Sequence, residues 1–249
     1  MTAGKGTGFV PRRALVTGAA RRLGRAMALA LAEDGYDLAL HVRAVDDDAE
    51  RLTSEIRALG RQAALVPADL RDLAAVASLL ATANDLLGPH GVLVNCAAVF
   101  PDDRLADLEA GQLEEVLRID LVVPMLLSQA FARQLPAGAG GVIVNLLDQR
   151  ILRPSGRRLS YTLAKSALWT ATRILARELA PSIRVVAIGP GVAIRDPDMD
   201  DATFNRLAER APLGGTGDAA AIVGALRYLL QAEAVTGQLL LPDGGMHLG

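Results

Sequence analysis

Short apolar segments alternate with helical patterns along nearly the whole chain, and this alternation limits the possible folds more than any other feature. The apolar segments are mostly continuous and lie at residues 14–17, 36–42, 63–66, 91–95, 141–147, 183–188 and 238–241. Strands that are buried on both faces read as continuous apolar runs, and strands separated by helices form parallel sheets. The sequence therefore predicts an α/β fold with a seven-stranded parallel sheet that helices cover on both faces.

The composition fits one domain and excludes several classes of protein. The chain has 249 residues, of which 51% are apolar and only 3% aromatic, so the core must be mainly aliphatic. A net charge of -2 gives no indication of a nucleic-acid partner or of a membrane surface, and no apolar run is long enough to span a bilayer. The single cysteine, Cys96, excludes an internal disulfide and a cysteine-rich zinc site. We expect a cytoplasmic protein without a metal, with residues 1–11 as a disordered lead-in and residues 12–249 as the domain.

A glycine-containing turn follows the first predicted strand and leads into a helical pattern. Its sequence, from Thr17 to Gly24, is TGAARRLG. A strand, such a turn and a helix N-terminus together form a phosphate site, because the first helical N–H groups are unpaired and the helix dipole is positive there. Gly18 would allow the tight turn, and Gly24 would allow the helix to pack closely on the strand. This predicts a dinucleotide site, with an ordinary strand-to-helix turn as the alternative.

The end of the second predicted strand indicates which dinucleotide binds. An acidic residue there selects the free ribose hydroxyl of NAD, whereas arginine accommodates the 2′-phosphate of NADP. Arg43 follows this strand, Arg22 lies in the glycine-containing turn, and no acidic residue lies between the end of the strand and Asp46. The acidic residues 46–48 are interpreted as the N-terminus of the next helix. The pattern favours NADP(H), with solvated surface arginines as the alternative.

Tyr161 and Lys165 are four residues apart in a helical pattern that no proline or glycine interrupts before Pro181. Positions i and i+4 share one face of a helix, so the phenol and the ammonium group can lie side by side. A nearby cation favours the phenolate, and we expect the pKa of Tyr161 to be lowered, which suits proton transfer near neutral pH. The alternative is an amphipathic helix with a chance Tyr and Lys.

Ligands of parallel sheets bind at the carboxyl ends of the strands. The residues expected there to bind the cofactor come from the strand ends, the turns that follow them and the Tyr161 helix: Gly18, Arg22, Leu23, Gly24, His41, Arg43, Asp69, Leu70, Asn95, Ala97, Tyr161, Lys165, Pro190 and Gly191. Residues 192–213 contain several Asp, Pro and Gly, and we expect them to form a mobile lid over the substrate.

Together these segments resemble the short-chain dehydrogenase/reductase family, from Ala14 to Leu248. The matching pieces, in order, are TGxxxxxG at 17–24, Asp69-Leu70, Asn95-x-Ala97, Tyr161-xxx-Lys165, Pro190-Gly191 and DGG at 243–245. The resemblance implies a single-domain, doubly wound Rossmann fold, a nicotinamide cofactor and a tetramer or dimer. It also implies that Tyr161 is the proton donor and that Lys165 tunes it and holds the nicotinamide ribose.

Three departures from the family pattern narrow the resemblance. Arg22 replaces the middle glycine, Asp148 replaces the catalytic serine, and Asp120 replaces an asparagine. The first two, together with the C-terminal segment 243–248, are similar to the pteridine reductase and dihydromonapterin reductase branch. That branch usually places an aromatic residue where this chain has Val99, and Phe100 follows. Either Phe100 stacks on the substrate instead, or the substrate is not a pterin.

The chemistry of Asp148 supports a flat heterocyclic substrate. Hydride addition to a C=N bond leaves charge on a ring nitrogen, and a carboxyl group beside Tyr161 can orient or protonate that nitrogen. We therefore predict an NADPH-dependent reductase of a pteridine or similar heterocycle, with Tyr161, Lys165 and Asp148 as catalytic residues and Phe100, Asp148 and Tyr161 at the substrate. The alternatives are a reductase of ordinary ketones, aldehydes or quinones, and an inactive dinucleotide-binding regulatory protein.

We also expect a homotetramer with a small-molecule substrate and no nucleic-acid or membrane partner. The resemblance is one reason. The other is that Leu168 and Trp169, and the apolar segment 239–241, exceed what one sheet face requires.

Overall fold

The computed structural model describes residues 10–192, 200–209, 211–215 and 217–249. Seven parallel strands form one sheet in the order β3-β2-β1-β4-β5-β6-β7, so the chain reverses its direction of progress between β1 and β4. Their bounds are β1 Arg13–Thr17, β2 Asp37–Val42, β3 Ala63–Pro67, β4 Val92–Asn95, β5 Gly141–Leu146, β6 Ile183–Ile188 and β7 Leu239–Leu240. The predicted doubly wound Rossmann fold is confirmed.

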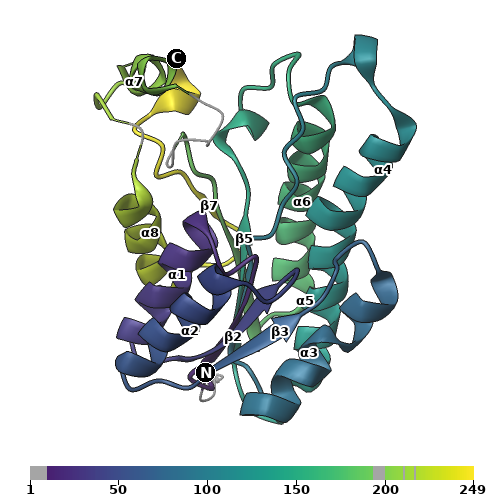
Figure 1. The fold of residues 1–249 in the computed structure, drawn as a ribbon, viewed down its shortest axis with the longest axis vertical. Coiled ribbons are helices and arrows are strands. Elements are labelled where there is room, and N and C mark those ends of the chain that lie inside the picture. Colours follow the sequence, from purple (N-terminus) through teal and green to yellow (C-terminus); the bar gives the residue numbers. More distant parts are fainter. Residues whose placement is uncertain (1–9, 193–199, 210, 216) are drawn as a thin grey trace, which may run out of the picture.

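Helices cover both faces of this sheet (Figure 1). One side carries α1 (Arg22–Glu33), α2 (Asp47–Ala58) and α8 (Ala219–Gln231), and the other carries α3 (Leu73–Leu87), α4 (Ala110–Leu117), α5 (Val123–Gln134) and α6 (Leu159–Glu178). Helix α7 (Asp201–Glu209) lies near the C-terminus, away from the N-terminal end of the chain (Figure 1).

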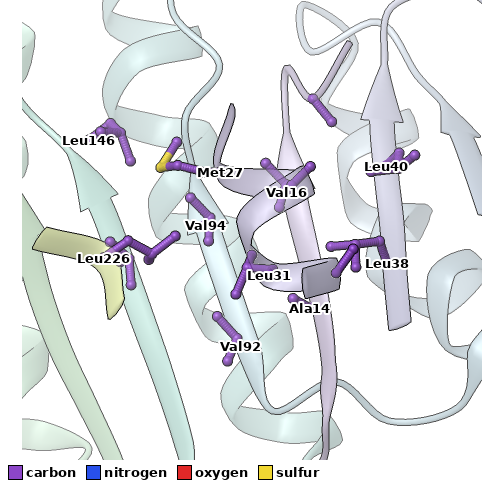
Figure 2. Packing of buried hydrophobic residues seen from close by; sticks show 14 of the residues in the cluster. Ala14, Val16, Met27, Leu31, Leu38, Leu40, Val92, Val94, Leu146 and Leu226 are labelled. Atoms are coloured by element: carbon purple, nitrogen blue, oxygen red, sulfur yellow. The ribbon is translucent and has the colours of Figure 1, made fainter. Parts of the chain in front are cut away.

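Alternate residues of each strand point to opposite faces of the sheet, as the pleat of a strand requires, and pack into a hydrophobic core on each face. Val16, Leu40 and Val94 pack against Met27 and Leu31 of α1 on one face (Figure 2). Their neighbours Leu15, Ala39 and Leu93 pack with the residues of α3 and α5 on the other face. Both strand faces are therefore buried, which explains why the strands read as apolar runs.

Four of the described helices begin at an aspartate that caps them. Asp46, Asp72, Asp200 and Asp218 each accept a hydrogen bond from a first-turn N–H of α2, α3, α7 and α8, at 2.6–3.0 Å. Helix α1 differs, because Arg21 at its N-cap makes no such hydrogen bond within the described residues. A helix N-terminus without a side-chain cap keeps N–H donors available for a ligand.

The region after α4 does not continue as one regular α-helix. Helix α4 passes into a π-helical segment, η2 (Arg118–Val122), and α5 follows directly. Pro124 lies in the first turn of α5, where its missing N–H needs no partner, so Pro124 does not break the helix. The wide turn of η2, and not Pro124, interrupts the regular α-helix.

Two predicted boundary segments lie partly outside the described residues. Of the lead-in at 1–11, residues 1–9 are outside, and Pro11 is already buried next to Gly91, so the prediction of disorder was wrong there. Of the lid at 192–213, residues 193–199 and 210 are outside, while α7 occupies part of the rest. None of the described helices is both long and apolar enough to cross a bilayer.

Candidate active site

A cavity of about 650 Å³ opens at the carboxyl ends of the central strands, where the strand order reverses. It is lined by nearly all the residues predicted for the site: Gly18, Arg22, Leu23, Gly24, His41, Arg43, Asp69, Leu70, Ala97, Phe100, Asp148, Tyr161, Lys165, Pro190 and Gly191. This is the position at which open α/β sheets bind their ligands. Among the described residues, no group of three His, Cys, Asp or Glu side chains is placed to hold a metal ion.

The glycine-containing turn is held closely against the sheet. Gly18 has a φ of +64°, and a Cβ at Gly24 would lie 2.1 Å from the Gly18 carbonyl oxygen, which no side chain tolerates. Arg22 has a φ of +51°, a left-handed conformation that glycine adopts more easily. Arg22 therefore keeps the backbone shape of the glycine it replaces and brings a cation to the cavity wall.

His41 supports this turn from the end of β2. Its Nδ1 accepts a hydrogen bond from the Gly18 N–H at 3.1 Å, and its Nε2 lies 3.1 Å from the Ala68 carbonyl oxygen. The two contacts require the neutral tautomer with the proton on Nε2. Burial lowers the pKa of His41, which favours the same neutral form. His41 thus ties the first turn to the loop after β3.

The acidic residues after β2 are neutralised by the turn itself. Arg21 lies 2.8 Å from an Asp46 oxygen and 2.6 Å from an Asp48 oxygen, and Arg51 also pairs with Asp48. Arg43, between this cluster and the cavity wall, is exposed. The end of β2 therefore presents a cation to the cavity, while Asp46 and Asp48 are already paired.

Asp69, at the end of β3, pairs with Arg71 at 2.6 Å. Hydrogen bonds from the Arg71 side chain and backbone lower the pKa of the Asp69 carboxyl to about 2, so Asp69 is ionised at neutral pH. Both residues line the cavity, and Arg71 was not among the predicted site residues. Its position two residues after Asp69 was the signal that could have indicated it.

Tyr161 and Asp148 meet at the inner part of the cavity. The Tyr161 hydroxyl donates to Asp148 Oδ2 at 3.4 Å, and Asp148 Oδ1 accepts from the Arg150 N–H at 2.8 Å. Burial raises the pKa of Asp148 above its ordinary value. The structure thus brings together Asp148 and Tyr161, two of the predicted site residues.

The expected lowering of the Tyr161 pKa was wrong for the protein alone. Burial, followed by the nearby Asp148 and Asp120 carboxylates, raises the pKa of Tyr161 well above 10. Lys165 does lie by the phenol, with Nζ 5.5 Å from the ring centroid. However, Nζ is also 3.3 Å from Asp120 Oδ2, so a carboxylate offsets the charge of Lys165 at short range. Tyr161 is consequently protonated at neutral pH.

Asp120, which replaces an asparagine of the family pattern, is held by two contacts inside the protein. It is completely buried in η2, and its Oδ1 accepts from the Val99 N–H at 2.9 Å. Its Oδ2 forms the ion pair with Lys165. Asp120 thus connects the loop after β4 to the helix that carries Tyr161, and no spacing in the sequence indicated this contact.

Phe100 occupies the wall beside Tyr161. The two ring centroids are 4.5 Å apart with an interplanar angle of 80°, an edge-to-face contact. Val99, which stands where an aromatic residue was expected, also lines the cavity and packs on Tyr161 and Ala164. Phe100 is therefore the aromatic residue that this cavity presents.

Asn95, which was predicted to bind the cofactor, does not line the cavity. Its side chain is buried and donates to Asn145 Oδ1 at 2.8 Å, and Asn145 in turn donates to the Thr172 hydroxyl at 2.9 Å. This chain of hydrogen bonds ties β4 to β5 and to α6. Asn95 therefore fixes the helix that carries Tyr161 and acts on the site only through it.

The cavity places an acid–base pair, Tyr161 and Asp148, in the same space as a glycine-rich turn at a helix N-terminus. A protein so built is an oxidoreductase of the dinucleotide-dependent class. The chain belongs to the short-chain dehydrogenase/reductase family, since the family model described as Enoyl-(Acyl carrier protein) reductase matches residues 18–247.

Proteins similar to this chain include both solved structures and curated relatives. The solved structure of FolM alternative dihydrofolate reductase 1 from Brucella suis, in complex with NADP, is 36% identical, covers 95% of each chain and has a TM-score of 0.91. The Brucella canis counterpart is 34% identical, with a TM-score of 0.92 over 99% of this chain and 97% of that one. The 3-oxoacyl-[acyl-carrier-protein] reductase FabG of Staphylococcus aureus is 30% identical over 244 residues, covering 95% of this chain and 98% of its own.

Proposed function

We propose that the chain is an NADPH-dependent reductase of a pteridine or a similarly flat heterocycle that contains a C=N bond. The observation that carries this proposal is the position of Asp148, whose carboxyl group lies 3.4 Å from the Tyr161 hydroxyl inside the cavity. A carboxyl group can hold the N–H and amino donors of such a ring, which a serine hydroxyl does less well. The likeness to the two FolM structures supports the same substrate class.

The cavity residues fit NADP(H) as the cofactor, as in the NADP complexes of the FolM proteins. The N-terminus of α1 suits the pyrophosphate, because the side chain of its N-cap residue, Arg21, does not cap it. Arg43 and Arg22 suit the 2′-phosphate, and Arg21 keeps Asp46 and Asp48 from repelling it. When bound, NADPH supplies the hydride.

The residues of this chain supply the proton and orient the substrate. Tyr161 is protonated at neutral pH because its pKa is raised, so it can donate its proton to the ring nitrogen that becomes negative. Asp148 accepts the N–H groups of the ring and, since burial raises its pKa, exchanges a proton with Tyr161 over a short path. Lys165 holds the nicotinamide ribose and, together with Asp120, fixes the position of the phenol.

A second candidate is a reductase of ordinary carbonyl compounds, which the likeness to the FabG proteins favours. Such a reaction needs only a neutral donor that polarises one oxygen. Tyr161 and Lys165 would serve it equally well, so Asp148 is the residue that separates the two candidates.

Replacement of Asp148 tests the proposal. If the substrate is a pteridine, Asp148→Ser should nearly abolish the reduction of dihydropterin, because serine cannot hold the ring donors. If the substrate is a simple carbonyl compound, the same variant should keep or gain activity on a model ketone. Asp148→Asn is the matched control, since it keeps the shape and the acceptor for the Arg150 N–H but removes the acid. Unchanged pteridine turnover in Asp148→Ser would overturn the assignment.

We further propose a homotetramer in the cytoplasm. Leu168 was expected to support the tetramer, but it does not, because it is buried inside the protomer against Leu147. The support comes from Leu163 and Ile174, which are 51% and 58% exposed on α6. Light scattering that gives a monomer at micromolar concentration would contradict the tetramer, and cell fractionation tests the location.

A further inference from the structure

Two arginines contact the ring of Phe100 at the rim of the cavity. The guanidinium carbon of Arg158 lies 4.0 Å from the ring centroid, and that of Arg150 lies 5.7 Å from it. Tyr161 contacts the same ring, with 4.5 Å between centroids. We call Phe100, Tyr161, Arg150 and Arg158 the Phe100 cluster. Its members come from the loops after β4 and β5 and from the start of α6, so separate segments converge on it.

Positive charge exceeds negative charge around this ring. The segment 149–158 contains four arginines and no acidic residue. Asp102 lies 3.8 Å from Arg158, but it is also bound by Arg157. Asp148 lies 3.8 Å from Arg150, and its burial favours the neutral acid. Both carboxylates therefore leave cationic charge near Phe100 that is not fully offset.

The Phe100 cluster is also accessible. Phe100 is 37% exposed, and the side chains of Arg150 and Arg158 are 30% and 22% exposed. Partly buried guanidinium groups are held in place by the ring and still reach solvent, which makes them suited to binding an anion. An arginine also matches a carboxylate or phosphate with two parallel hydrogen bonds.

We propose that Arg150 and Arg158 form an anion subsite at the rim of the cavity, which binds a carboxylate or phosphate carried by the substrate outside its reducible group. This inference rests on the proposed function and narrows its substrate class to compounds that carry an anionic substituent. Because Phe100 contacts Tyr161, one ligand can present its reacting ring to Tyr161 and Asp148 and its substituent to the arginines. A substituent with an aryl ring and carboxylates, as in dihydrofolate, offers one group to Phe100 and another to the guanidinium pair.

The subsite is tested with pairs of related substrates, of which one member carries a charged substituent and the other does not. Dihydrofolate is compared with its dimethyl ester, dihydroneopterin monophosphate with dihydroneopterin, and acetoacetate with methyl acetoacetate. The first two pairs distinguish a carboxylate from a phosphate on a pteridine, and the third covers a simple ketone. For each pair, Kd is measured by calorimetry on the enzyme loaded with NADP⁺, and kcat/KM is measured with NADPH. We expect about tenfold tighter binding of the charged member in at least one pair, as for one charge-assisted hydrogen bond.

The variants separate the charge of the subsite from its packing. Arg150→Met removes the charge at similar length, and Arg150→Lys keeps it. Arg158 has a φ of +58°, so Arg158→Asn is preferred, because asparagine tolerates that conformation. Arg153→Met is the matched control, since Arg153 is exposed on the same loop but outside the Phe100 cluster. The measured quantity is the ratio of Kd, and of kcat/KM, between the charged and the neutral member of each pair. A general loss of activity does not change this ratio.

The outcomes distinguish this inference from the proposed function. Loss of the charge preference in Arg150→Met and Arg158→Asn, with the preference kept in Arg153→Met and Arg150→Lys, supports the subsite. If that pattern holds for acetoacetate while pteridines neither bind nor react, the pteridine assignment fails and the subsite stands. Equal affinity for both members of all three pairs in the unmodified enzyme overturns the subsite. An unchanged ratio in both arginine variants overturns it as well.

Discussion

Lys165 and Asp120 form a buried ion pair behind Tyr161, with Nζ 3.3 Å from Oδ2 and side chains that are 2% and 0% exposed. Tyr161 is therefore adjacent to a paired charge instead of an isolated cation. The Asp120 carboxylate also contributes to the raised pKa of Tyr161, after burial and Asp148. Asp120 consequently controls the acidity of a residue that it does not touch.

Asp120→Asn should lower the pKa of Tyr161. Tyr161 must be protonated to donate, so reduction is lost as pH rises through its pKa, and the alkaline limb of kcat/KM should move to lower pH. The asparagine oxygen can still accept from the Val99 N–H. The measurement is the pH profile at saturating NADPH. Asp85→Asn, which removes the same charge from an exposed site on α3, should leave the profile in place. A profile unchanged in Asp120→Asn would refute this electrostatic role.

Lys165→Met should reduce the free energy of unfolding by about 3 kcal/mol, because it leaves Asp120 buried without its partner. The double variant Lys165→Met/Asp120→Asn should recover most of this loss, since neither side chain then carries a charge. Urea unfolding of both single variants and the double variant measures the coupling. Additive effects of the two substitutions would show that the pair contributes no coupling energy.

Tyr161→Phe should lose about 10²–10⁴-fold in kcat, the typical contribution of a general acid. The edge-to-face contact with Phe100 needs no hydroxyl, so the fold of the site should be kept. Pre-steady-state turnover and the Kd for NADPH are the measurements, with Tyr228→Phe, exposed on α8, as the control. Comparable losses of kcat and of NADPH affinity would indicate a structural effect instead.

Arg43→Asp should shift the preference from NADPH towards NADH. The exposed arginine suits a 2′-phosphate, whereas an acid in its place repels that phosphate and accepts from a free ribose hydroxyl. The ratio of kcat/KM for NADPH to that for NADH should fall at least tenfold, as expected for the loss of one hydrogen bond to a charged group. Arg133→Asp, exposed in the last turn of α5 and outside the cavity, controls for the change in net charge. A ratio that does not fall would place the 2′-phosphate elsewhere.

The stability of the fold should fall as pH drops from about 6.5 towards 4 because of His90. His90 is fully buried, and burial, followed by the nearby Arg13, lowers its pKa to about 4. The unfolded chain binds this proton at a higher pH than the folded chain does. Protonation of His90 therefore lowers the free energy of unfolding by about 1.4 kcal/mol at pH 5.5. Within the described part of the chain, His90 Nε2 has no hydrogen-bond partner to receive an added proton. The midpoint of urea unfolding at pH 7.5 and 5.5 should differ less in His90→Gln. An equal difference in both proteins would assign the acid sensitivity to other groups.

The sequence predicted those features that depend on local pattern. The seven strands, the capping Asp46 and the i, i+4 placement of Tyr161 and Lys165 follow from periodicity and spacing, and the structure confirms them. The partners of buried polar groups could not be predicted in this way. Asn95 bonds to Asn145, fifty residues away, and Lys165 bonds to Asp120, because the order of strands in the sheet brings them together.

The acidity of Tyr161 illustrates the same limit. A cation four residues away predicts a lower pKa, and that reasoning is correct for two isolated groups. Burial and two carboxylates, one from the loop after β5 and one from η2, reverse the direction of the pKa shift, and both effects depend on packing between distant segments. The wide turn at η2 could not be predicted either, because the residues 118–122 contain no glycine or proline that would mark it.

The geometry of the site depends on the exact number of residues in the π-helical segment η2. A π-helical turn contains about one residue more than an α-helical turn. Deleting one residue from 118–122 would restore a regular helix and rotate the preceding part by about 100° relative to α5. Asp120 would then no longer face Val99 and Lys165 together. A single deletion that removes none of the acid–base residues would thus expose or orphan the ammonium group behind Tyr161.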